Sequence, residues 1–323
     1  MSFCLPQRWI VCVVMGFVAA SLPGQLTIGE EASADSPVEA PVPKQLYHLR
    51  YKFQRGDTVF YDEQQRTTKT IKGGGLVDVT KTETSARKHY RVVSVDGVGT
   101  GLLELELDRV KMQVDFGNGA PLVKFDSESK EPPPSQFRPM MDSIGKPQVR
   151  MRLAANGELK KVQLLNRSNQ RAVGQLRSAP RTDASDPSHN FLVVFPQESI
   201  AVGHSWSDRI AVDVRTTKTL LRPITLLRRY SLTSVKDGLA TVSISTRILT
   251  PIRDPKILTQ LIQRTPSGTA VFDLDRGVIV EKTMTINKRQ VGGITEKSLM
   301  HVISKRTERL VEPTQKTASR DSK

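Results

Sequence analysis

Cysteine is almost absent from this sequence. The two cysteines among its 323 residues, Cys4 and Cys12, both lie within the first twelve positions. We expect that segment to be removed, so the remaining chain has no thiol for a disulfide or a cysteine metal site. Its stability must then come from a buried core.

Aromatic residues and blocks of like charge are also scarce. Five tyrosines and two tryptophans are too few for a stacking platform on single-stranded nucleic acid. The formal net charge is +15, but the basic residues are dispersed, in pairs such as Arg228-Arg229. This pattern predicts attraction to an anionic envelope polymer or lipid, and no sequence-specific nucleic-acid binding.

The N-terminus has the pattern of a secretory signal. Arg8 is the sole charge in the first 29 residues, and an apolar run follows it from 9 to 22. That run is shorter than the ~20 residues of a spanning helix. It predicts a cleaved signal peptide and a secreted or periplasmic protein; an uncleaved N-terminal membrane anchor is the alternative.

Composition divides the chain into successive parts. Stretches rich in proline, serine, alanine and charge predict a spacer, a linker and a disordered tail between and around two β-rich segments. The expected parts are a signal peptide (1–24), a flexible spacer (25–44), a first half (45–165), a linker (166–190), a second half (191–312) and a tail (313–323).

The two halves share a series of motifs in the same order. A Gly turn leading into a strand occurs at 56–58 and again at 203–205, and Tyr90 aligns with Tyr230. Each half continues with a proline-led helical segment and a hairpin turn, Asn156-Gly157 or Arg276-Gly277. An internal duplication accounts for all of these matches.

Period-two alternation predicts that most of each half is antiparallel strand. Leu103, Leu105 and Leu107 share one face, and the alternation then changes parity at Asp108, which predicts a β-bulge. Apolar stripes after Ser135 and after the Asp254-Pro255 cap predict two short helices. The expected fold is α+β and β-rich, with two related halves, each a curved antiparallel sheet packed on a short helix.

Gly203-His204-Ser205 resembles part of a lipase nucleophile elbow, which would make Ser205 a catalytic serine. An elbow requires a helix directly after the serine, but Ile210, Val212 and Val214 alternate there as in a strand. We therefore predict a turn into a strand, no catalytic residue and no enzyme, with a serine hydrolase as a minor alternative. None of the five histidines has the spacing of a metal pair, so no metal site or cofactor is expected.

A curved sheet wrapped on a helix can enclose an apolar cavity. Methionine and phenylalanine adapt to irregular apolar ligands, so their side chains in the first half are candidates for its lining. A filled core is the alternative. The candidate ligand-binding residues are Met112, Phe116, Phe137, Met140, Met141 and Ile144.

The order "KFQRGDTVFY", "YRVVSVDGVGTGLLELELDRVKM", "FDS" and "IGKPQVRMRLAANGELKKV" resembles a family of exported bacterial proteins of unknown function, with similarity to planctomycete members, over about residues 46–310. The resemblance implies a β-rich fold and assigns no catalytic residue. We therefore predict a non-enzymatic envelope binding or scaffold protein, and as alternative a carrier of lipid or another apolar ligand.

Overall fold

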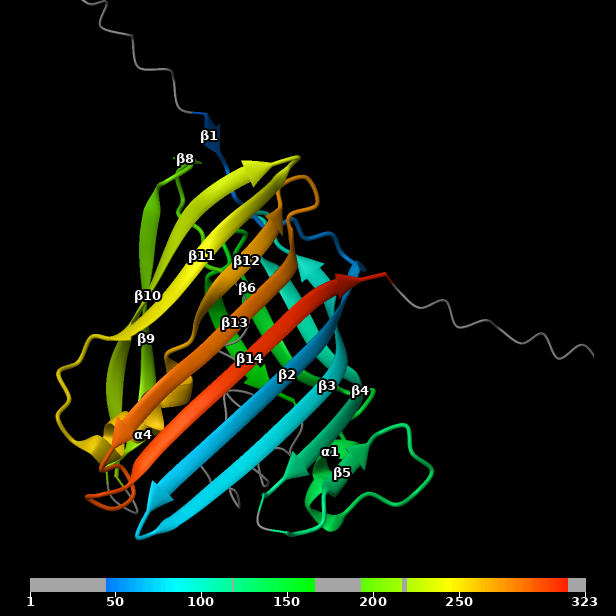
Figure 1. The fold of residues 1–323 in the computed structure, drawn as a ribbon. Coiled ribbons are helices and arrows are strands. Elements are labelled where there is room, and N and C mark those ends of the chain that lie inside the picture. The colour runs from blue at the N-terminus through cyan, green and yellow to red at the C-terminus, as the bar shows by residue number, and fades with distance from the viewer. Residues whose placement is uncertain (1–44, 118, 166–192, 217–219, 313–323) are drawn as a thin grey trace, which may run out of the picture. The chain divides into compact units, whose positions relative to one another are not determined.

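A computed structural model describes residues 45–117, 119–165, 193–216 and 220–312 (Figure 1). The predicted signal peptide, spacer, linker and tail lie outside these described residues. The predicted β-rich segments are the parts that the structure does describe, and antiparallel strands dominate both of them.

One large antiparallel sheet contains nearly all of the strands. Its path is β7-β6-β4-β3-β2-β14-β13-β12-β11-β10-β9, with β5 paired to β4 as a branch. A separate two-stranded ladder joins β1 (Leu46–Tyr47) to β8 (Ile200–Ala201). The strands of the large sheet are β2 (Thr58–Gly73), β3 (Leu76–Val95), β4 (Gly101–Asp115), β5 (Val123–Asp126), β6 (Pro147–Leu153), β7 (Leu159–Leu164), β9 (Ser205–Arg215), β10 (Leu221–Lys236), β11 (Leu239–Ile248), β12 (Ser267–Asp273), β13 (Val278–Val291) and β14 (Leu299–Val311).

The pairing of β14 with β2 joins strands from the two ends of the described chain. Thirteen residues of β14 pair with β2, from Leu299 opposite Lys72 to Val311 opposite Phe60. The sheets expected for the two halves are therefore parts of a single continuous sheet. All other neighbours along the path are consecutive strands, except that β5 and α1 lie between β4 and β6 in the sequence.

The sheet buries one face, which we call the inner face and define by Tyr61, Tyr90, Val242 and Phe272. Alternate residues of each strand belong to it, as the period-two pattern predicted. In β4 the register shifts so that Lys88 of β3 pairs with Leu107 while Arg87 pairs with Arg109. Asp108 is the extra residue, which confirms the predicted bulge and keeps the leucine and valine side chains on the inner face.

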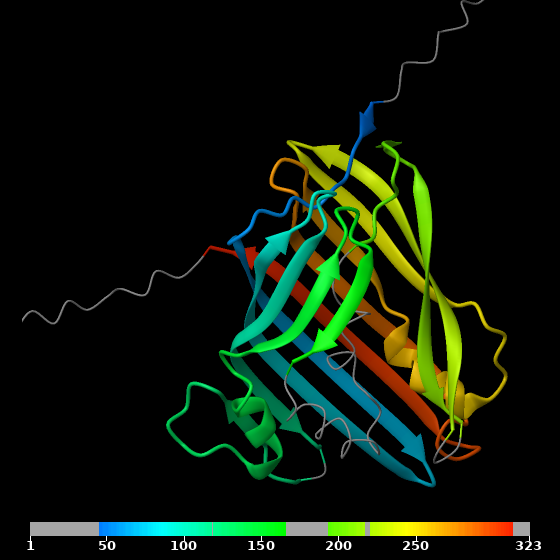
Figure 2. The same cartoon turned by 180° about the vertical axis from the view of Figure 1, so that it is seen from behind.

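Two short helical segments accompany the sheet. Helix α4 (Pro255–Leu261) begins at its predicted cap, where the Asp254 carboxylate accepts a hydrogen bond from the Lys256 N–H at 2.8 Å. It buries Ile257 and Leu261 against β9 and β10. Figure 2 shows the helix beside these strands. The first-half stripe is less helical than expected, because α1 covers only Arg138–Met141 after a 3₁₀ turn, η1 (Ser135–Phe137).

After each Gly turn three long antiparallel strands come first, and a short helix and further strands follow; the first segment adds β5 before α1, and the second ends with the additional strand β14. The Gly56 N–H donates to the Val92 carbonyl at 2.9 Å, and the Val92 N–H donates back to Asp57. In the second segment the Gly203 N–H donates to the Leu232 carbonyl at 2.7 Å, and the Leu232 N–H donates back to the carbonyl of His204.

The strand after Ser205 is the one that the sequence predicted. Ser205 is the first residue of β9, and its hydroxyl lies 2.5 Å from that of Ser231 on β10. No helix follows it, so the backbone geometry of a nucleophile elbow is missing at this position. Among the described residues no helix is long and apolar enough to span a lipid bilayer.

Candidate functional site

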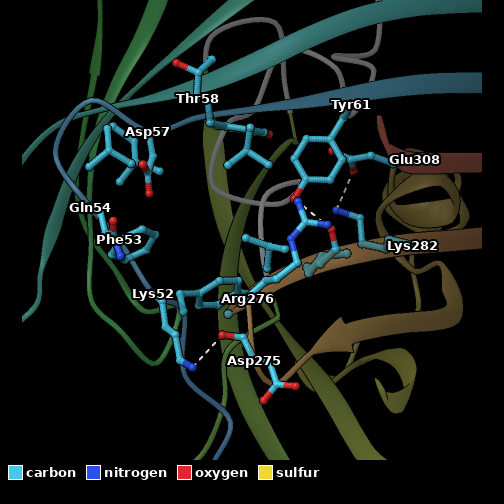
Figure 3. Close-up of a pocket in the computed structure, with 18 residues that line it drawn as sticks. Lys52, Phe53, Gln54, Asp57, Thr58, Tyr61, Asp275, Arg276, Lys282 and Glu308 are labelled. Atoms are coloured by element: carbon cyan, nitrogen blue, oxygen red, sulfur yellow. Dashed lines mark hydrogen bonds and ion pairs between the residues drawn. The ribbon is translucent and has the colours of Figure 1, made fainter. Parts of the chain in front are cut away.

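A cavity of about 390 Å³ lies on the inner face near the start of β2 (Figure 3). One wall is the segment from Tyr51 to Gln54, which precedes β2. The adjoining wall is the β12–β13 turn with Arg276 and Gly277. The floor is formed by side chains of β2, β3, β4, β13 and β14, so the sheet itself shapes the cavity.

Backbone hydrogen bonds fix the two walls. The Tyr51 N–H donates to the Ala155 carbonyl at 2.7 Å, and the Lys52 N–H donates to the Gly277 carbonyl at 3.2 Å. Gly277 has a φ of +66°, and a Cβ there would collide with the backbone and side chain of Lys52. The wall therefore requires glycine at this turn.

Apolar and aromatic side chains cover much of the cavity surface. Tyr61 and Tyr90 meet edge to face, with ring centroids 5.8 Å apart, and Val92 and Leu103 are buried beside them. The Tyr61 hydroxyl donates to the Ile279 carbonyl at 3.0 Å, which leaves its ring facing the cavity. Such a surface binds an apolar group by excluding water.

Beneath this surface lies a cluster of five charged side chains from four adjacent strands. The Lys88 ammonium group is 2.9 Å from a carboxylate oxygen of Glu63 and 2.9 Å from one of Glu308. Lys282 also lies 2.9 Å from Glu308, and Arg306 lies 2.8 Å from Glu63. We call these five residues the charge cluster; Lys282 and Glu308 reach the cavity.

Burial and mutual attraction oppose each other in the charge cluster. Burial alone would raise the pKa of Glu308, but Lys282, Lys88 and Arg306 outweigh it and hold that pKa far below its ordinary value. Burial alone would lower the pKa of Lys88, but the attraction of Glu308 and Glu63 outweighs it and raises that pKa. Lys282 is the exception, because burial dominates there and lowers its pKa.

The rim of the cavity is polar. The Lys52 ammonium group donates to the Asp275 carbonyl at 2.7 Å, and Figure 3 shows Arg276 extending from the same turn toward Tyr61. The Asp273 carboxylate accepts from the N–H groups of Asp275 and Arg276 and so shapes this turn. The site thus combines an apolar floor with charged groups at its rim, and the charge cluster lies beneath that floor.

The predicted ligand-binding residues lie elsewhere on the inner face. Met112, Phe137, Met140, Met141 and Ile144 pack around the buried side chains of Ala86, Val110 and Phe125. Phe116 does not join them and is 40% exposed at the end of β4. Met112 also borders a second hollow of about 400 Å³, whose other lining residues are mostly polar.

Sequence reasoning did not find the cavity or the charge cluster. One signal was present: Ser304, Arg306 and Glu308 follow Val302 at period two, so polar residues interrupt an apolar face. No pattern in the sequence predicts that Glu63 and Lys88 lie beside Arg306 and Glu308. Among the described residues no group of three or more histidine, cysteine or carboxylate side chains could hold a metal ion.

Comparisons with known proteins give only distant similarities. No protein-family model and no curated protein matches the sequence. A solved structure described as "Lipid-protein interactions in lipovitellin" has a TM-score of 0.43 and 12% identity, covering 81% of this chain and 26% of that one. This chain therefore spans about a quarter of lipovitellin.

Two bacterial structures are more distant still. An outer membrane channel from Pseudomonas putida has a TM-score of 0.25 at 9% identity, covering 81% of this chain and 97% of the channel. A DUF1329 family protein from Desulfovibrio piger has a TM-score of 0.15 at 11% identity, covering 75% and 83%. At such scores none of the three indicates what the cavity binds.

Proposed function

We propose that this chain is an exported, non-enzymatic binding protein of the cell envelope that holds an amphiphilic lipid on the inner face of its sheet. The observation that carries the proposal is the cavity of about 390 Å³ with its tyrosine, valine and leucine floor. Small-molecule sites occupy roughly 300–1,000 Å³ and combine apolar walls with a few polar groups. The apolar part of the ligand lies on Tyr61, Tyr90 and Val92, and its polar head lies at the rim near Lys52 and Arg276.

This site differs from the one expected from the sequence. The expected cavity lay between the first-half sheet and its helix, whereas the proposed one lies between the sheet and the Tyr51–Gln54 segment. The methionines of the helix pack on Phe125, so they form part of the proposed scaffold.

Native mass spectrometry with solvent extraction, on protein purified without detergent, tests the proposal. We expect a lipid adduct at one copy per chain. Val59 lines the cavity, so Val59→Trp is expected to fill it and reduce the adduct. Ile303→Trp on the outer face of β14, at a side chain 48% exposed, is the matched control and should retain it.

Two results would overturn the proposal. One is a clean ligand-free mass together with no displaceable binding of a fluorescent fatty acid to the purified protein. The other is an adduct that Val59→Trp and Ile303→Trp affect equally, since the lipid would then bind outside the cavity.

A scaffold that binds an anionic envelope polymer is the second candidate. The observation that favours it is the net charge of +15 on a chain whose basic residues are dispersed. Binding of this kind weakens as salt screens the charges, so retention on an anionic polysaccharide column should fall steeply with added salt. Retention that salt does not change would remove this candidate.

The internal duplication remains part of the proposal. The paired hydrogen bonds of Gly56 with Val92 and of Gly203 with Leu232 support it. So do the register shifts that follow Val92 in β3 and Leu232 in β10 at equivalent places. Two copies of one strand-rich unit joined through β2 and β14 account for both observations.

A further inference from the structure

Two hairpin turns lie side by side at the end of the sheet opposite the lipid cavity. The β2–β3 turn follows Gly73, and the β13–β14 turn precedes Leu299, which pairs with Lys72. A Cβ on Gly73 would come within 3.3 Å of Ser298, so the two turns are in contact range. Figures 1 and 2 both show them together at this end, beside α4.

These two turns expose large apolar side chains. Leu76 is 77% exposed, Val77 is 61% exposed, Val291 is 59% exposed and Ile294 is 49% exposed. We call these four residues the apolar tip. The turns at the opposite end of the sheet carry single exposed residues such as Val98. Exposed apolar side chains gathered in one place mark an interaction surface.

The two glycines of the β2–β3 turn set the backbone conformation that exposes Leu76. Gly74 and Gly75 have φ values of +60° and +78°, the conformation of a tight two-residue hairpin loop. Leu76 follows directly as the first residue of the twenty-residue strand β3, so its side chain lies at the end of the sheet and away from the core. No element of the described chain needs these side chains for its own packing, because none belongs to a core cluster.

Basic side chains surround the apolar tip. Helix α4 lies against the second turn, since a Cβ on Gly292 would come within 3.4 Å of Pro255. Around the two turns, α4 and the β9–β10 connection, the described residues place seven exposed basic side chains and four exposed acidic ones. The basic residues are Lys72, Arg215, Arg222, Arg253, Lys256, Arg289 and Lys297, and the acidic residues are Asp78, Asp213, Asp254 and Glu296.

We propose that the apolar tip inserts into an anionic lipid bilayer while the surrounding basic side chains contact lipid phosphates. Apolar residues that enter the acyl boundary and basic residues that meet anionic head groups are the two contributions to peripheral membrane binding. The proposal does not depend on the lipid cavity, which lies at the other end of the strands. A second protein would need a complementary acidic surface, and it is an outcome of the test below.

Vesicle co-sedimentation of the full chain tests the surface. We expect pelleting with vesicles of phosphatidylcholine and phosphatidylglycerol, little pelleting with phosphatidylcholine alone, and loss of binding at high salt. Leu76→Asp combined with Ile294→Asp is expected to weaken binding at least about tenfold, because two charges would have to enter the bilayer. Lys72→Glu with Lys297→Glu should remove the preference for anionic vesicles.

Val98→Asp is the matched control, since Val98 is 84% exposed in a turn at the opposite end. It should bind vesicles as the unchanged chain does, and circular dichroism should show all variants folded. The proposal is overturned if the control loses as much binding as the tip variant, or if vesicles never pellet the chain. It is also overturned if the tip variant abolishes a dimer seen by ultracentrifugation while vesicle binding persists.

The lipid proposal and the membrane proposal fail separately. The tip variant should keep the lipid adduct in native mass spectrometry, because its substitutions are remote from Val59 and Tyr61. Loss of vesicle binding with the adduct intact identifies the tip as a membrane contact, and loss of the adduct alone concerns the cavity.

Discussion

Glu308→Gln removes the carboxylate at the centre of the charge cluster with almost no change in volume. Glu308 is 4% exposed and lies 2.9 Å from the ammonium groups of both Lys88 and Lys282. Removing one partner of a buried ion pair costs about 3–5 kcal/mol of unfolding free energy, because the remaining charges stay desolvated. We expect a loss in that range.

The matched control is Glu281, whose side chain lies on the outer face of the sheet. Glu281 precedes Lys282 on β13 and pairs with Arg309 at 2.9 Å, but both side chains are largely solvated, at 39% and 66% exposure. Exposed ion pairs contribute about 0–1 kcal/mol, so Glu281→Gln should have a small effect. The two variants remove the same chemical group from opposite faces of the sheet.

Urea unfolding followed by circular dichroism measures both losses, provided that the slope of free energy against urea is unchanged. The reasoning is refuted if Glu308→Gln costs no more than Glu281→Gln. That result would mean that water reaches the charge cluster and screens it.

The dependence on pH gives a second readout of the same group. The folded state holds the pKa of Glu308 below the ordinary glutamate value of 4.5, so its contribution is complete above pH 4.5 and is lost as the pH falls below that value. Burial alone would raise the pKa of Glu63, but Lys88 and Arg306 outweigh it and lower that pKa, so Glu63 adds to the same trend. Glu308→Gln should therefore flatten the loss of stability on acidification, and an unchanged slope would contradict the assignment.

Two further predictions concern the sheet and its tyrosines. Gly268→Ala should lower the free energy of unfolding in urea by about 2–3 kcal/mol, because the added Cβ would overlap the Thr283 backbone on β13. Gly97→Ala is the control, since no atom lies within 4 Å of the added Cβ, and it should change that free energy by less than about 0.5 kcal/mol. Equal effects would show that β12 can shift to make room. Burial raises the pKa of four tyrosines, so the stability they contribute is complete below pH 10 and is lost above it. Four of the five tyrosines should give tyrosinate absorbance only as circular dichroism reports unfolding. An early rise larger than one tyrosine can give, with an intact fold, would contradict the burial of Tyr51, Tyr61, Tyr90 and Tyr230.

Local patterns in the sequence predicted the features that depend on neighbouring residues. The bulge at Asp108, the α4 cap at Asp254 and the strand after Ser205 each follow from a few adjacent residues. The helix after Ser135 is shorter than expected, since α1 has four residues and ends at Met141, before a turn that contains Ser143 and Gly145. A single helical turn is not stable alone, and this one packs on Phe125.

The cavity and the charge cluster were not predictable because they depend on contacts between distant parts of the chain. The Arg306 guanidinium and the Glu63 carboxylate that it contacts are 243 residues apart. Period-two patterns state which face a residue occupies but not which strand becomes its neighbour. Strands with the correct alternation could therefore have been arranged in several orders within the sheet. The position of the site follows from the order that this chain adopts.

The charge cluster lies at the pairing of β2 with β14, where the register is least constrained by short turns. Glu63 lies directly opposite Glu308 in this register, an unfavourable arrangement unless cations separate the carboxylates. Lys88 contacts both of them, so it stabilises this alignment. A shift of β14 by one residue against β2 would move Glu308 to the outer face and leave Lys88 with Glu63 alone. We infer that the cluster, although costly to desolvate, specifies the register by which the two ends of the sheet join. The same register places Tyr61 beside Ile279 and so forms the floor of the cavity.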